Sequence, residues 1–199
     1  MLVPQPFGML PESSIASYDF TEFTSNLGYV AFYPYLASGS YLTTNNSIYA
    51  SQAVIGPTPT ECSFAVTFNR SAVIGGPAVV NILLGQYNGN AMTSDNVVSF
   101  YKNNTLIASG ASITTPSENT GGAFVKTKVL TWNIEVPSTT MGKGDIFTMR
   151  VSYTNTGNGT LYLGADPVNR SWADIGFAAP TAGPDLTRST ALIPFRIDL

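Results

Sequence analysis

Short runs of alternating apolar and polar residues, separated by clusters of Gly, Asn, Asp, Ser and Pro, recur from residue 18 onward. Residues 61–68 alternate cleanly, and residues 77–84 form a nearly continuous apolar run of strand length. No segment shows a sustained apolar period of 3.6 residues, which indicates almost no helix. Roughly ten short strands with frequent turns are typical of an antiparallel sandwich or barrel. The sequence therefore predicts an all-β fold, a single antiparallel β-sandwich that is jelly-roll-like.

The chain divides into two parts by composition. Residues 1–17 carry three prolines and several serines, which predicts an extended N-terminal arm. Residues 18–199 are predicted to form one β-sandwich domain, because domains of about 100–200 residues bury a substantial core without disulfides.

The alternation and the turn residues place individual strands. Pro194 confines the last strand to an edge position or a bulge, since proline has no N–H group to donate. A bulge is also predicted near Lys126 and Lys128, which otherwise share a face with apolar residues. We expect strands at residues 28–35, 47–55, 61–68, 77–84, 96–110 as a hairpin around Asn103 and Asn104, 123–136, 146–153, 160–164 and 190–199.

The chain has no histidine and one cysteine, and its 9 Lys and Arg against 12 Asp and Glu give a net charge of −3. Without histidine there is no Ser/His/Asp or Cys/His triad and no imidazole metal ligand. Cys62 has no partner for an intrachain disulfide. Its place on the apolar face of residues 61–68 predicts a buried side chain rather than a reactive thiol. The negative net charge argues against direct binding of nucleic acid.

Charged residues make up 11% of the chain, less than half of the usual ~25%. A surface this neutral is typical of proteins that pack against many neighbours or bind neutral ligands. No apolar run approaches the ~20 residues that span a bilayer, so we expect no membrane span. The N-terminus has no recognisable secretory signal, and a lone cysteine fits folding in a reducing cytoplasm.

Three oxygen-bearing side chains in the loop-rich region, Asp166, Asn169 and Asp174, form a candidate cation site. Asp and Asn also hydrogen-bond their own backbone in turns, and this alternative is favoured because the spacing matches no EF-hand loop. Glu118 and Glu135 are a conceivable glycosidase pair, but nothing distinguishes them from other pairs of acids. The sequence therefore assigns no catalytic, metal-binding or cofactor-binding residue, and it predicts no cofactor.

Aromatic side chains are the other candidates for a site. Tyr29, Tyr33 and Tyr35 share one face of the strand predicted at residues 28–35, and Trp172 lies in the predicted loop as a candidate exposed anchor. Exposed rings of this kind stack on sugars or contact protein partners. We favour core packing or a subunit contact over a glycan-stacking platform for these four residues.

Both ends of the chain and its middle carry a family resemblance. Residues 18–23, 28–33, 48–51 and 189–199 resemble the opening and closing segments of small β-sandwich proteins encoded among structural genes of environmental tailed phages. Residues 100–107 are similar to the hairpin Y-K-N-G-T-L-I of lectin-like jelly rolls, with Asn104 in place of the glycine. The resemblance implies a virion structural component with a jelly-roll-like fold and transfers no catalytic residue.

These observations lead to the expectation of a non-enzymatic virion structural protein: a capsid, capsid decoration or tail-associated component made in the host cytoplasm. It would act through contacts with other copies of itself and with other virion proteins, and surface glycans are a further expected partner. The alternative is a carbohydrate-binding or receptor-binding β-sandwich module. A histidine-free hydrolase built on paired carboxylates is the least favoured hypothesis.

Overall fold

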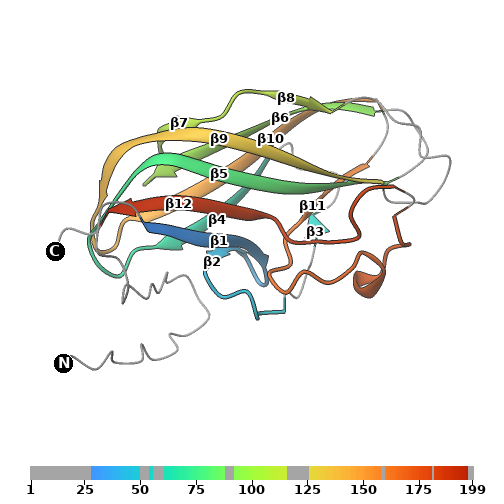
Figure 1. Cartoon of the computed structure of the whole chain (residues 1–199), viewed down its shortest axis with the longest axis horizontal. Helices are drawn as coiled ribbons and strands as arrows, with labels where there is room; N and C mark the ends of the chain where they lie inside the picture. Colours follow the sequence, from blue (N-terminus) through green and yellow to red (C-terminus); the bar gives the residue numbers. More distant parts are fainter. Residues whose placement is uncertain are drawn as a thin grey trace.

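The computed structural model describes residues 28–49, 54–55, 61–87, 92–115, 126–157, 160–180 and 182–196 (Figure 1). The predicted arm, residues 1–17, lies outside these ranges. The described residues contain no helix with the length and hydropathy needed to cross a bilayer. The elements are β1 (Gly28–Leu36), β2 (Ser40–Thr43), β3 (Val54–Ile55), β4 (Glu61–Thr67), β5 (Ala72–Tyr87), β6 (Met92–Lys102), β7 (Thr105–Ser109), β8 (Ile113–Thr115), β9 (Lys126–Met141), β10 (Ile146–Gly157), β11 (Thr160–Gly164), the short 3-10 helix η1 (Ala173–Ile175) and β12 (Thr190–Arg196).

The described strands form one continuous sheet in the order β3-β11-β5-β12-β1-β2-β4-β10-β6-β7, with β9 added on β5 and β8 on β6. Strand β1 is shared: Gly28 to Phe32 pair with β12, and Tyr33 to Leu36 pair with β2. The sheet folds over at β1, so that the layer of β3, β11, β5, β9 and β12 faces the layer of β2, β4, β10, β6, β7 and β8 (Figure 1). All described strand pairs are antiparallel except β2 with β4. The predicted all-β, antiparallel fold is confirmed.

Strand β5 organises the first layer. Its 16 residues pair with β9 along one edge, and the other edge pairs first with β12 and then with β11. A strand covered by the opposite layer needs apolar residues on its inner face, and Ala78, Val80, Ile82 and Leu84 supply them. Leu83 points the other way and is buried against Trp172, so the apolar run at residues 77–84 lies inside β5 and serves both faces.

The core between the layers is rich in phenylalanine. The ring of Phe32 lies 6.2 Å from the ring of Phe147 and 6.1 Å from that of Phe195, and Phe100 lies 5.3 Å from Phe147. All four rings are at most 1% exposed. Burying such a side chain stabilises the fold by about 1.5–3 kcal/mol.

Cys62 belongs to this core, as predicted. It is 5% exposed, and its Sγ lies 3.8 Å from Tyr153 Oη. Burial raises the pKa of the Cys62 thiol, which keeps it protonated and unreactive at neutral pH.

The strand predicted at residues 47–55 is wrong at its start. Residues 47–49 are not a strand, Val54–Ile55 is one, and residues 50–53 lie outside the described residues. Ser47 N donates to Asn45 Oδ1 at 2.8 Å and Asn45 N donates to Thr43 Oγ1 at 3.1 Å. These local bonds compete with a ladder and hold a turn instead. Strands β2 and β8 were not predicted, since 4 and 3 residues are too few to show alternation.

The register shows where the bulges lie. The β5–β9 pairing runs without a shift from Gly76 opposite Val136 to Gln86 opposite Lys126, so the bulge predicted near Lys126 and Lys128 is absent. Strand β12 does shift register between Leu192 and Phe195, on either side of Pro194. The missing proline N–H is thus accommodated by a bulge within a strand that is paired on both sides.

The β6–β7 turn is fixed by Asn103 and Asn104, whose φ angles of 47° and 67° are left-handed, as the predicted hairpin requires. Asn103 Nδ2 donates to Asp145 Oδ1 at 2.7 Å, and Asn103 Oδ1 accepts from Ile146 N at 2.8 Å. Lys102 Nζ lies 2.9 Å from Asp145 Oδ2. The carboxylate of Asp145 thereby ties the β6–β7 turn to the β9–β10 turn.

Substitution of Phe32 by alanine is expected to destabilise the fold by roughly 3–5 kcal/mol, because it leaves a cavity between both layers. Urea unfolding of Phe32→Ala and of the native chain measures the difference. Leu106→Ala is the control, since Leu106 is 54% exposed and should change stability by under about 0.5 kcal/mol. Equal losses in the two variants would contradict the placement of Phe32.

Acid is expected to remove the contribution that Asp145 makes to the stability of the fold. Its bonds with Lys102, Asn103 and Gly142 N lower the pKa of the Asp145 carboxyl from the ordinary 3.8 to about 2 in the folded chain. The stabilisation is therefore fully present above about pH 4 and is lost as the pH falls through about 2. Urea unfolding of the native chain and Asp145→Asn between pH 6 and pH 2 checks this. A stability difference that stays constant over the whole range would show the expectation to be wrong.

Candidate functional site: the loop between β11 and β12

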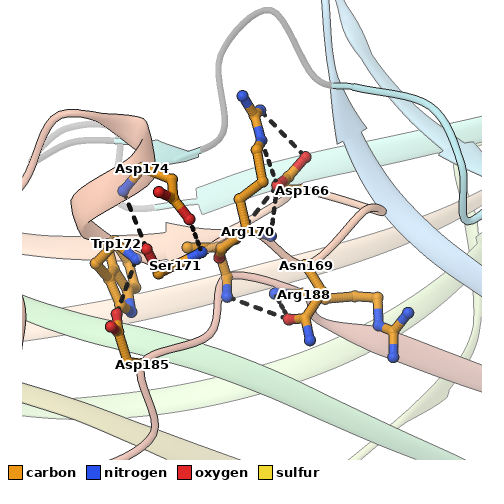
Figure 2. A network of polar contacts seen from close by, with 9 residues as sticks. Asp166, Asn169, Arg170, Ser171, Trp172, Asp174, Asp185 and Arg188 are labelled. Carbon is orange, nitrogen blue, oxygen red and sulfur yellow. Dashed lines mark hydrogen bonds and ion pairs between the residues drawn. The ribbon is translucent and has the colours of Figure 1, made fainter.

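Side chains hold the segment between β11 and β12 in shape (Figure 2). Asp166, two residues after the end of β11, is completely buried. Its carboxylate accepts hydrogen bonds from Arg170 Nε at 2.9 Å, Arg170 Nη2 at 3.3 Å and Arg170 N at 3.0 Å. This bidentate arrangement is the strongest common form of arginine–carboxylate contact. The bond with Asp166 raises the pKa of the Arg170 guanidinium above its already high value.

Near its end, at Thr187, the segment contacts the residues with which it begins. Thr187 Oγ1 donates to Arg170 O at 2.6 Å, and Asp166 N donates to Thr187 O at 3.1 Å. The close approach needs a glycine in β11, because a Cβ at Gly164 would lie 2.5 Å from Thr187 O. The buried ion pair and this contact together fix the base of the loop.

Asn169 joins the two arginines of the loop. Its φ of 68° is left-handed, which asparagine tolerates better than most residues. Its Oδ1 accepts from Arg188 N at 3.0 Å and from Thr187 N at 3.3 Å. Arg170 follows Asn169 in the chain, so these bonds hold the backbones of Arg170 and Arg188 beside each other (Figure 2).

Trp172 is not the exposed anchor that the sequence suggested, because it is 0% exposed. Its ring meets Phe177 edge-on at 5.6 Å and packs in a small cluster with Leu83. Its backbone N–H donates to Asp185 Oδ1 at 2.9 Å, whereas its indole Nε1 has no hydrogen-bond partner among the described residues. The apolar character of the ring therefore outweighs the cost of one buried N–H, about 1–3 kcal/mol.

Asp166, Asn169 and Asp174 do not converge on a common point, so the candidate cation site is not formed. The Asp166 carboxylate faces Arg170, and the Asn169 oxygen faces Arg188 N. Asp174 Oδ2 accepts from Ser171 N at 3.2 Å in the turn of η1 (Figure 2). Over the part of the chain that the structure describes, no group of three His, Cys, Asp or Glu side chains is placed to hold a metal ion.

The arginine–tyrosine patch consists of Tyr33, Tyr49, Arg170 and Arg188. The Arg188 guanidinium lies 5.5 Å from the centre of the Tyr33 ring, and the Arg170 guanidinium lies 5.2 Å from that of Tyr49. Tyr49 is 67% exposed, and Tyr33 and both arginines are partly exposed. Unlike Arg170, Arg188 has no carboxylate within ion-pair distance among the described residues.

The three tyrosines predicted to share a face of β1 have different environments. Tyr29 is 47% exposed, Tyr33 is partly exposed beneath Arg188, and Tyr35 is 7% exposed against Tyr41. Tyr35 is therefore a packed residue and not a surface anchor. Tyr33 forms an arginine–tyrosine pair with Arg188 and is not an isolated surface ring.

Arg170 and Arg188 were not singled out from the sequence. A signal was present, since a chain with only 9 Lys and Arg places two arginines in one loop. Arginine presents a planar fork of donors that fits a carboxylate, and a stacked aromatic ring holds that fork in position. The patch can accordingly bind a carboxylate through Arg188 and a flat or apolar group beside it.

No family model and no curated protein sequence matches this chain. A CocE/NonD family hydrolase from Staphylococcus aureus has a similar structure, with a TM-score of 0.56 and 10% identity over 86% of this chain and 37% of its own. An α-amino acid ester hydrolase has a TM-score of 0.56 and 11% identity over 84% of this chain and 36% of its own. An aminopeptidase from a marine sediment archaeon, Thaumarchaeota archaeon, has a TM-score of 0.50 and 10% identity over 84% of this chain and 37% of its own. The chain thus spans little more than a third of each hydrolase.

These likenesses correct the functional expectation. The expected non-enzymatic virion structural protein is wrong, because the three structures named above, which share the fold at a TM-score of 0.50 or above, are hydrolases. A structure of infectious bursal disease virus aligns with a TM-score of only 0.29, which supports no statement. The resemblance to phage proteins rested on short strand and turn patterns that unrelated β-sandwiches share, and fold alone does not identify function.

Substitution of Arg170 by alanine is expected to cost roughly 3 kcal/mol of stability, because it removes the guanidinium that forms an ion pair with the buried Asp166 carboxylate. Arg188→Ala is the matched control, since its guanidinium contacts a ring and no carboxylate among the described residues. Urea unfolding at pH 7 compares the two variants. A loss for Arg188→Ala equal to that for Arg170→Ala would contradict the structural role of the Asp166–Arg170 pair.

Proposed function

We propose that this chain is the substrate-recognition β-sandwich of a hydrolytic system that acts on esters or peptides. The observation that carries the proposal is the match of 84–86% of the chain to 36–37% of several hydrolases. The named activities of two of them, an amino acid ester hydrolase and an aminopeptidase, give the class of substrate.

The arginine–tyrosine patch supports a role in recognition. Arg188 is held at its backbone by Asn169 and at its side chain by the ring of Tyr33. A group fixed in this way loses little conformational freedom on binding, which favours affinity. A peptide with a free C-terminus offers a carboxylate for Arg188 and, next to it, a side chain for the ring surface.

The experiment is a calorimetric titration of the purified chain with the tripeptide alanyl-alanyl-tyrosine as the free acid and as the C-terminal amide. We expect the free acid to bind at least tenfold more tightly, a difference of ~1.4 kcal/mol. Arg188→Gln is expected to remove most of that difference, since glutamine keeps polar contacts but not the charged fork.

Arg150→Gln is the matched control. Arg150 also lies over a tyrosine, 4.3 Å from the centre of the Tyr101 ring, but on the outer face of β10 and within 3.7 Å of Glu61. The Arg150→Gln substitution should leave binding of the tripeptide unchanged. Equal affinity for acid and amide, or equal effects of the two substitutions, would refute the proposed recognition.

A further inference from the structure

Strand β9 pairs with β5 along one edge, and no described strand lies beside its other edge. The N–H of Thr127 donates to Ala182 O at 3.0 Å, so it points away from β5. Leu83, opposite Val129, directs its own N–H away from β9, to Ser189 Oγ at 2.9 Å. In an antiparallel pair such positions alternate with those that bond across the pair. Every second residue from Thr127 onward therefore turns its N–H and C=O to the outer edge of β9.

The open edge of β9 consists of the backbone groups of Val129, Thr131, Asn133 and Glu135. The pairing with β5 has no shift through this stretch, so the alternation holds along all of it. The bridge between Lys126 and Ala182 covers the edge before the stretch, and Pro137, which has no N–H, ends it. Residues 129–133 include no charged residue, proline or bulge, the features that usually protect an edge strand. The open edge is thus suited to pairing with another strand.

The opposite layer offers apolar side chains beside this edge. The second layer reaches past β9 on this side, where β7 and β8 form its border (Figure 1). Ile107, Ala108 and Ile113 of these strands pack against the core but remain partly exposed. The connection between β7 and β8 contacts a side chain of β9, since Trp132 Nε1 donates to Ala111 O at 2.8 Å. A strand added to the open edge would lie over the three partly exposed apolar residues.

We infer that an extended peptide segment of a partner protein binds at the open edge of β9 as an additional antiparallel strand. Its backbone pairs with Val129 to Glu135, and its inward side chains, at every second position, are apolar. A lysine or arginine lies opposite Glu135, which is exposed and forms no ion pair with a described residue. This surface shares no residue with the arginine–tyrosine patch and does not depend on the function proposed for it.

A peptide fits this edge better than a second copy of the chain. Two β9 strands that pair antiparallel are related by a two-fold axis perpendicular to the sheet, so the second layers of both copies lie on the same side. Because β7 and β8 reach past β9 (Figure 1), these second layers would collide before the β9 strands could pair. A single extended segment has no second layer and avoids this collision.

The experiment is a titration of the full chain with the peptide acetyl-Lys-Val-Thr-Val-Ser-Val-Lys-amide, followed by ¹H–¹⁵N NMR and amide hydrogen exchange. The first lysine is placed opposite Glu135, and the valines face inward. We expect saturable binding and slower exchange of the amide protons of Val129, Thr131, Asn133 and Glu135, because these groups gain hydrogen bonds. The amide protons of Trp132 and Ile134, which face β5, should exchange slowly with and without the peptide.

N-methylation of the peptide tests the backbone pairing. Methyl groups on the nitrogens of the third and fifth residues remove the N–H groups that face β9, and we expect at least tenfold weaker binding. A methyl group on the nitrogen of the fourth residue, whose N–H faces solvent, should leave binding unchanged. Replacing the first lysine by glutamate should weaken binding at least twofold. Equal binding of the methylated peptides, or no saturation by the unmodified peptide, would overturn the inference.

Asn133→Pro removes one N–H group of the open edge, and Asn133→Ala is the matched control because it keeps that N–H. We expect Asn133→Pro to weaken peptide binding at least fivefold, whereas Asn133→Ala and Arg188→Gln should leave it unchanged. A dimer of the chain that dissociates on Asn133→Pro, measured by sedimentation equilibrium, would assign the edge to a second copy and contradict the inference. The methylated peptides decide the question on the unaltered chain even if Asn133→Pro fails to fold.

Discussion

The packing of Phe32 against rings from both layers is the contact on which the rest of the structure depends. Strand β1 is shared by the two layers, and the Phe32 ring contacts Phe147 of one layer and Phe195 of the other. At the opposite side the layers meet again where Trp132 Nε1 donates to Ala111 O at 2.8 Å. The core is thus bounded on both sides, and the ends of the molecule are where polar side chains enter it.

Much of this fold follows from alternation of side chains. Residues 61–68 and 146–153 alternate so regularly that their strands, and the burial of Cys62, were predicted correctly. A two-residue period fixes which side chains point inward as soon as one inward residue is known. Strands β2 and β8 were missed because so few residues show no period.

Alternation also explains why a bulge was wrongly predicted near Lys126 and Lys128. A bulge was predicted there because charged side chains are not expected on a core face, but the register is continuous and the lysines do face inward. The general preference for apolar residues inside was overridden at the end of the core, where strands β6 and β8 of the opposite layer carry the buried polar side chains of Ser94 and Thr115.

The loop site was less predictable than the fold. Asp166 was noticed as a possible cation ligand, but its partner Arg170 was not, because a bidentate pair depends on the left-handed turn at Asn169. The burial of Trp172 depends on contacts with Leu83 and Phe177, and the single-sequence pattern carries no information on which distant segments meet. Tertiary contacts, rather than residue types, decided which aromatic side chains reached the surface.

The loop and the inward lysines share one structural element. Thr127 lies between Lys126 and Lys128. Its N–H donates to Ala182 O at 3.0 Å, and its Oγ1 donates to Pro184 O at 2.5 Å. A side chain at position 183 would collide with this contact, since a Cβ there would lie 2.0 Å from Thr127 O. The loop that carries the arginine–tyrosine patch therefore holds the beginning of β9 in place. Because Thr127 points toward the loop, the residues on either side of it lie on the opposite face of β9, which faces the other layer, and the loop helps to set the position of both lysines.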